Sequence, residues 1–124
     1  MLVASRAESA FEPRSYLADP GQFGRVYTAA LRQGVALEER SLLAASLCQH
    51  RAACVIIERR EVGEFTSRAL AERLGIDEGM MSRYLTGEVP LPLTGLLSWA
   101  FELEDPSILP DLDEVYTIVR SNAA

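Results

Sequence analysis

The 124-residue chain contains no lysine, a single histidine and only two cysteines. Enzymes that use a nucleophile with a base, and sites that bind a metal, generally need clusters of such residues. A glycine-rich phosphate-binding loop is also missing from the sequence. We therefore expect a protein that is not an enzyme, with no catalytic residue, no metal ligand and no cofactor.

The two cysteines lie six residues apart, at Cys48 and Cys54, with His50 between them. Metal-binding pairs are usually closer, as in C-x-x-C, and positions six apart in a helix point to different faces. The pattern favours two buried thiols in a reduced compartment over a metal site or a disulfide.

Long apolar runs are absent as well, since none approaches the roughly 18 residues that a membrane-spanning helix needs. Residues 1–10 include Arg6 and Glu8 and lack the apolar stretch of a secretory signal. We expect a cytoplasmic protein without a membrane partner. Hydrophobic residues make up 48% of the chain, which is enough for the core of one compact domain.

The formal net charge is −6, an unfavourable balance for a protein that binds a polyanion. The excess lies at one end of the chain. Residues 1–83 hold 11 arginines and 11 acidic residues, whereas residues 84–124 hold seven acidic residues and only Arg120. Arginine can form paired hydrogen bonds to phosphate or guanine, so the neutral part of the chain is compatible with DNA binding.

Alanine, leucine, glutamate and arginine dominate, and apolar residues recur at helical spacing, which predicts an all-α bundle. Residues 1–21 show little periodicity and are expected to form an arm. Phe23, Val26, Tyr27, Ala30 and Leu31 predict a helix that Gly34 caps. The segment from Leu37 to Val62 is either one long helix or two helices broken near residues 49–51. Further helices are expected at 93–103 and 111–120, the latter with Leu112, Val115, Tyr116 and Val119 on one face.

Residues 66–87 carry the most informative pattern. Thr66 is a good N-cap, Ala69, Leu70 and Leu74 form an apolar stripe, and Gly75 ends the first helix. Asp77 caps a second short helix from Glu78 to Leu85, which Gly87 closes. Two helices joined by a short turn that contains glycine are typical of a helix-turn-helix.

Such a motif predicts which side chains contact DNA. The first helix would direct its N-terminus at a phosphate, with Thr66, Ser67 and Arg68 as anchors. The second helix would enter the major groove with Glu78, Gly79, Ser82 and Arg83 exposed, while Ile76 and Met81 face inward. Arg83 is the best candidate for a guanine contact, with Ser82 beside it. Arg73 and Tyr84 are further candidates for phosphate contact, whereas Arg59 and Arg60 are expected to be the solvated end of a helix.

The stretch FTSRALAERLGIDEGMMSRYLTG, residues 65–87, resembles the helix-turn-helix core of the lambda-repressor-like (Xre/Cro) family. The resemblance rests on the Phe-Thr opening, the Leu-Ala pair, Leu-Gly-Ile at the turn, and Ser-Arg-Tyr followed by Gly. It extends over roughly residues 55–105 and implies a five-helix-type DNA-binding bundle that acts as a homodimer on a two-fold operator. A weaker resemblance, through Arg51-Ala52-Ala53, is to the C-terminal domain of the replication initiator DnaA.

These observations divide the chain into four expected parts: an arm (1–21), an N-terminal helical extension (22–50), a helix-turn-helix DNA-binding core (51–105) and a C-terminal helix that could contact a second subunit (106–124). The leading hypothesis is a sequence-specific regulator of transcription that binds double-stranded DNA as a homodimer. The alternative is a protein-interaction module on the same scaffold: an antirepressor, an adaptor to RNA polymerase, or the N-terminal DNA-binding part of a larger activator. The charge of −6 and the position of Glu78 motivate that alternative.

Overall fold

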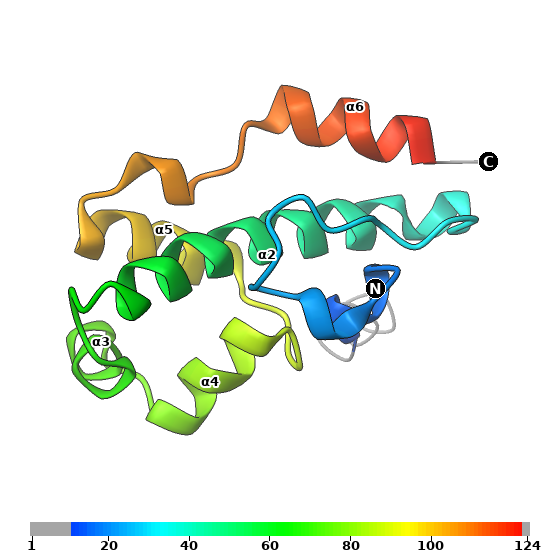
Figure 1. The fold of residues 1–124 in the computed structure, drawn as a ribbon. Helices are drawn as coiled ribbons and strands as arrows, with labels where there is room; N and C mark the ends of the chain where they lie inside the picture. Colours follow the sequence, from blue (N-terminus) through cyan, green and yellow to red (C-terminus); the bar gives the residue numbers. More distant parts are fainter. Residues whose placement is uncertain (1–10, 123–124) are drawn as a thin grey trace, which may run out of the picture.

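The computed structural model describes residues 11–122, and this part of the chain is helical, with no strand beyond one isolated bridge between Leu17 and Leu31. The prediction of an all-α fold is confirmed. One long helix runs through the middle of the molecule, with α6 on one side of it and α3 and α4 on the other (Figure 1). The α-helices of the described part are α2 (Arg40–Glu61), α3 (Ser67–Leu74), α4 (Glu78–Thr86), α5 (Leu93–Leu103) and α6 (Leu112–Asn122).

Helix α2 is the element on which the core is built. Its sequence is rich in alanine and leucine and free of glycine and proline, so the helix continues without a break to Glu61 and the chain reverses at Gly63, where φ is +86°. Of the two expected arrangements, the single long helix is the one observed. The expected boundary near residue 50 falls inside this helix. Its buried apolar residues are Leu43, Leu47, Ala52, Ala53, Ile56 and Ile57.

The segment before α2 differs from the expectation. The helix predicted from Phe23 to Leu31 is wrong: this stretch forms turns, and Gly24 adopts a φ of +72° that a helix does not allow. Phe23 and Leu31 are buried as the pattern required, but Val26 and Tyr27 are 40% and 49% exposed. Local turn bonds and a bond to a distant residue, from Ala18 N–H to the Ala30 carbonyl (2.8 Å), take the place of the helical pattern.

The described part of the expected arm, residues 11–21, belongs to the core. Pro13–Tyr16 forms a 3-10 helix against α2, and Tyr16 and Leu17 are 4% and 1% exposed. The Tyr16 hydroxyl donates a hydrogen bond to Glu39 (2.6 Å), and burial, with that carboxylate close by, raises the pKa of Tyr16 to about 12. Residues 1–10 of the predicted arm lie outside the described part of the chain.

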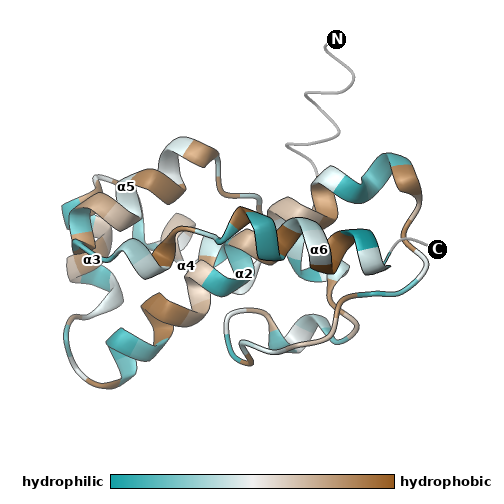
Figure 2. Ribbon diagram, turned by 90° about the horizontal axis from the view of Figure 1, so that it is seen from above, coloured by the Kyte–Doolittle hydropathy of each residue, from teal (hydrophilic) through white to brown (hydrophobic). Residues whose placement is uncertain are grey.

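Helices α5 and α6 begin and end close to where the sequence predicts, but not every residue expected on the buried face of α6 is buried. Trp99 is 1% exposed on α5, and Val115 and Val119 of α6 are buried, with α6 packed against α2. Leu112 and Tyr116, expected on the same face of α6, are 68% and 66% exposed. The apolar residues of both helices stand out in brown in Figure 2.

Candidate nucleic-acid interface

Helices α3 and α4 are both short, and each begins and ends as the sequence predicts. The Thr66 hydroxyl accepts a hydrogen bond from Ala69 N–H (3.0 Å), and the Asp77 carboxylate accepts one from Met80 N–H (3.1 Å). Gly75 and Gly87 follow the two helices with φ values of +68° and +76°, the left-handed conformation in which glycine commonly ends a helix. Three residues, 75–77, therefore connect the two helices.

Apolar contacts between α3 and α4 fix the angle between them. Leu70 and Ala71 of α3 and Met81 and Leu85 of α4 are all buried. Ile76, in the connection, is half-buried against the same cluster. The predicted inward orientation of Met81 and Ile76 is thus observed, and the opposite sides of both helices remain exposed.

Hydroxyl and guanidinium groups gather at the N-terminus of α3. Thr66 is exposed, Ser67 is half-buried, and the Arg68 side chain is 79% exposed and lies 3.9 Å from the Glu72 carboxylate. Arg60, at the end of α2, donates a hydrogen bond to the Ser67 hydroxyl (2.8 Å). Arg60 was expected to lie at the solvated end of a helix, but it is half-buried. The chain reversal at Gly63 returns α3 to the end of α2 and so places Ser67 beside Arg60.

The outer side of α4 carries the other candidate residues. Glu78, Gly79, Ser82 and Arg83 are all exposed, and within residues 11–122 no carboxylate lies at ion-pair distance from Arg83. Gly79 has a local explanation, because a Cβ at this position would lie 2.8 Å from the Asp77 carboxylate that caps the helix. Glu78 lies in the first turn of α4, where a negative charge is favourable with respect to the helix dipole.

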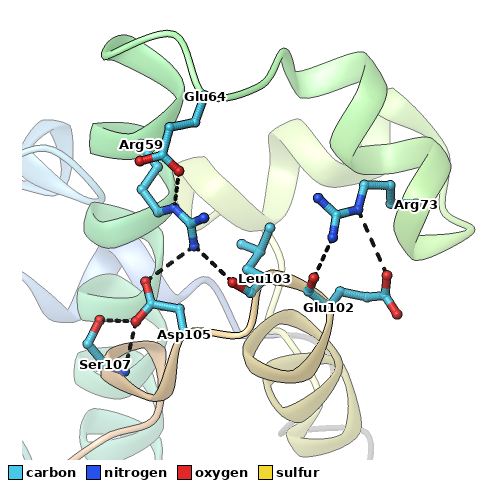
Figure 3. A network of polar contacts seen from close by, with 7 residues as sticks. All are labelled: Arg59, Glu64, Arg73, Glu102, Leu103, Asp105 and Ser107. Carbon is cyan, nitrogen blue, oxygen red and sulfur yellow. Dashed lines mark hydrogen bonds and ion pairs between the residues drawn. The ribbon is translucent and has the colours of Figure 1, made fainter.

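The last two candidates, Arg73 and Tyr84, are engaged with α5. Arg73 donates a hydrogen bond to the backbone carbonyl of Glu102 and lies 3.9 Å from its carboxylate (Figure 3). The half-buried ring of Tyr84 packs edge-on against Trp99, with ring centroids 6.2 Å apart. Both side chains hold the α3–α4 pair against α5.

Arg59 anchors the start of the same unit. Its guanidinium contacts Glu64 (2.6 Å), Asp105 (3.3 Å) and the Leu103 carbonyl (3.3 Å), so it joins the end of α2 to the end of α5 (Figure 3). Hydrogen bonds from Ser107, together with Arg59, hold the pKa of Asp105 below its usual value. The expectation of a solvated Arg59 is therefore wrong.

The cysteines and the histidine lie away from this surface, on α2. Cys54 is buried and Cys48 is half-buried, both are free thiols, and burial raises the pKa of Cys54 to about 11. The His50 ring accepts a hydrogen bond from Gly24 N–H at Nδ1 (2.9 Å), and Nε2 donates to the Val26 carbonyl (2.9 Å). Burial lowers the pKa of His50. These groups serve the packing of α2 against the N-terminal segment.

Within residues 11–122, no group of three or more histidine, cysteine or acidic side chains is arranged to bind a metal ion. None of the helices in that range combines the length and apolar character required to cross a membrane. Comparison with protein-family models, with curated proteins and with solved structures finds no match.

Proposed function

We propose that α3 and α4 form a helix-turn-helix and that the protein is a sequence-specific, double-stranded-DNA-binding regulator of transcription, acting in the cytoplasm. The observation that carries this proposal is the pairing of two capped short helices across a three-residue turn, with the outer side of α4 exposed. In such a motif the second helix enters the major groove and the first lies across the phosphate backbone.

The available cations support this assignment. Among the arginines of the α3–α4 region, Arg59 and Arg73 are engaged within the fold, whereas Arg68 and Arg83 are exposed at the places where a helix-turn-helix contacts phosphate and bases. We assign base contact to Arg83 and Ser82, and phosphate contact to Arg60, Thr66, Ser67 and Arg68. Glu78, at the leading end of α4, is suited to accept a hydrogen bond from a cytosine amino group.

A homodimer is part of the proposal, because a chain of net charge −6 gains affinity when two copies place their arginines on one duplex. Exposed apolar residues for such a contact lie on α5, where Leu93, Leu97 and Phe101 follow at intervals of four and are 70%, 36% and 79% exposed. Leu112 and Tyr116 of α6 are a second exposed apolar pair, 68% and 66% exposed. Sedimentation of Phe101→Ser and Tyr116→Ser variants would identify the helix that forms the contact.

The proposal is tested by selecting bound sequences from random duplex DNA and measuring affinity by fluorescence anisotropy. Arg83→Ala is expected to weaken binding to the selected site about 5- to 150-fold, the equivalent of one bidentate base contact. Arg68→Ala is expected to weaken binding to all duplexes and to reduce the slope of log K against log salt by about 1. Arg120→Ala, on α6, is the control, provided that sedimentation shows it to associate like the wild type, and it is then expected to bind DNA like the wild type. If neither Arg83→Ala nor Arg68→Ala weakens binding, the assigned surface is wrong.

A protein-interaction module is the second candidate, favoured by the exposed apolar residues of α5 and α6 and by the acidic residues 84–124. The two functions differ in their salt dependence. A DNA-binding protein loses affinity steeply as salt rises, because condensed counterions are released on binding. The absence of any salt-sensitive binding to duplex DNA would favour the second candidate.

A further inference from the structure

Gln49 is a buried polar residue in the middle of α2, and its side chain satisfies three backbone groups around the end of α4. It is 4% exposed. Its Nε2 donates to the carbonyls of Tyr84 (2.9 Å) and Val89 (3.0 Å), and its Oε1 accepts from Leu91 N–H (2.7 Å). One side chain thus binds both the last turn of α4 and the link that leads to α5.

An apolar residue would be the ordinary choice at such a buried position on α2. The backbone groups that Gln49 contacts belong to a helix end and an irregular link, where no regular ladder pairs them. A buried amide is costly unless its hydrogen bonds are made, and here both ends of the amide are used. Because these three hydrogen bonds are short, at 2.7–3.0 Å, they also fix the distance between α2 and the end of α4.

The neighbouring His50 extends this support to the N-terminal segment. It binds Gly24 and Val26, and that segment in turn contacts the end of α4. Arg14 N–H donates to the Gly87 carbonyl (3.0 Å), and a Cβ at Gly87 would lie 2.8 Å from the Phe23 ring. The end of α4 is therefore held from two directions, by α2 and by residues 14–26.

We propose that Gln49 is a positioning residue that fixes the orientation of α4, and with it the exposed side chains Ser82 and Arg83, through its hydrogen bonds to Tyr84, Val89 and Leu91. This inference rests on the proposed function for its consequence in DNA binding. Recognition of base edges tolerates displacements of only a fraction of an ångström, so a loosened α4 loses discrimination among sequences before it loses contact with phosphates.

The test is Gln49→Met, which keeps the length and volume of the side chain and removes all three hydrogen bonds. Leu43→Ala, six residues earlier on α2 and at a residue that is 0% exposed, is the matched control, because it removes apolar packing from the core and leaves all three hydrogen bonds of Gln49 in place. Affinity is measured at a temperature at which circular dichroism shows every variant fully folded. Gln49→Met is expected to bind the selected site at least about fivefold more weakly, with little change for random duplex, while Leu43→Ala binds like the wild type.

Two readouts separate this inference from the proposed function. If the wild type binds DNA and Gln49→Met retains its affinity although the Leu91 amide has lost its protection from hydrogen exchange, the positioning role is overturned and the proposed function remains. If the wild type does not bind DNA, residual dipolar couplings of the α4 amides relative to α2 decide. A changed orientation in Gln49→Met then supports the positioning role, and an unchanged one overturns it.

Discussion

At the scale of single residues, glycine is required where two segments of chain approach each other closely. Gly87 ends α4 with a φ of +76°, and a Cβ there would lie 2.8–2.9 Å from three atoms of the Phe23 ring. Gly34 has a similar φ of +71°, but a Cβ there would meet nothing within 4 Å. The two positions therefore differ in crowding and not in backbone conformation.

This contrast yields a prediction for a pair of alanine variants. Gly34→Ala is expected to cost only the left-handed conformation, about 1 kcal/mol. Gly87→Ala adds overlap with the Phe23 ring and is expected to cost about 2–4 kcal/mol. Urea unfolding measures both, and equal losses of stability would contradict the packing of Phe23 on Gly87.

His50 gives the fold a defined pH dependence. Its Nδ1 accepts from Gly24 N–H, so protonation of this nitrogen would break the bond and add a charge in a buried place. Burial lowers the pKa of His50 from 6.5, assisted by the neighbouring Arg51. The unfolded chain then binds the proton more readily than the folded one, so stability is fully present above about pH 6.5 and falls as the pH drops below it.

The expected slope in that window is at most about 1.4 kcal/mol per pH unit, the limit for one proton. Urea unfolding at several pH values between about 5 and 8 measures it. His50→Gln is expected to flatten the profile in this range. Asp105, whose pKa is lowered from 3.8, titrates in a separate and more acidic window. An unchanged slope in His50→Gln would assign the effect to another group.

At the scale of elements, the arginines near α3 and α4 divide into those that hold helices together and those that remain exposed. Arg59 links α2 to the end of α5, with its side chain 26% exposed. Within the described residues, the one ion-pair partner of Arg68 is Glu72, at 3.9 Å, and both side chains are more than three-quarters exposed. Exposed pairs of this kind contribute little to stability.

Opposite effects are therefore expected from the same substitution at the two positions. Arg59→Met should lower the free energy of unfolding by about 1–2 kcal/mol, because its partners at the helix ends lose a charged donor. Arg68→Met should change stability by less than about 0.5 kcal/mol. Under the proposed function, Arg68→Met weakens DNA binding and Arg59→Met, measured where it is folded, does not. Thermal unfolding measures the loss of stability and fluorescence anisotropy the loss of DNA affinity, and both are measured on both variants.

At the scale of the whole molecule, residues 11–36 and the helices share one core. Leu17 is 1% exposed in the same apolar cluster as the buried residues of α2, α4 and α5. A domain with one shared core usually unfolds in a single cooperative transition. The N-terminal segment should accordingly not unfold before the rest.

The variant Leu17→Ala tests whether the N-terminal segment and the helices unfold in one cooperative transition. It is expected to cost about 2–5 kcal/mol and to lower the unfolding midpoint equally for Trp99 fluorescence, which reports on α5, and for far-ultraviolet circular dichroism. Val26→Ala, in the same segment but at a residue that is 40% exposed, should change stability by less than about 0.5 kcal/mol. Separate midpoints for the two probes in Leu17→Ala would indicate that the segment is an independent unit.

The sequence predicted those parts of the fold that depend on local signals. Caps such as Thr66 and Asp77, and glycines such as Gly75, act on their own neighbours, so the bounds of α3 and α4 followed from the pattern. The segment from Phe23 to Leu31 has helical spacing, but its backbone is paired with Leu17 and Ala18 and with His50, which periodicity does not report. Arg60 and Gln49 were missed for a related reason, since their partners come close only after the chain has reversed at Gly63 or passed beyond α4.

The hydrogen bond from Arg14 to Gly87 has a further consequence for the order of assembly during synthesis. More than half of the chain separates these two residues, so the N-terminal segment leaves the ribosome long before the end of α4 has been translated. Until then Leu17 and Phe23 have only part of their final surroundings. The conformational entropy lost on closing this long loop is therefore incurred late in folding. We expect folding to be slower than in helical bundles of similar size whose contacts are local, because contacts between distant parts of a chain slow folding.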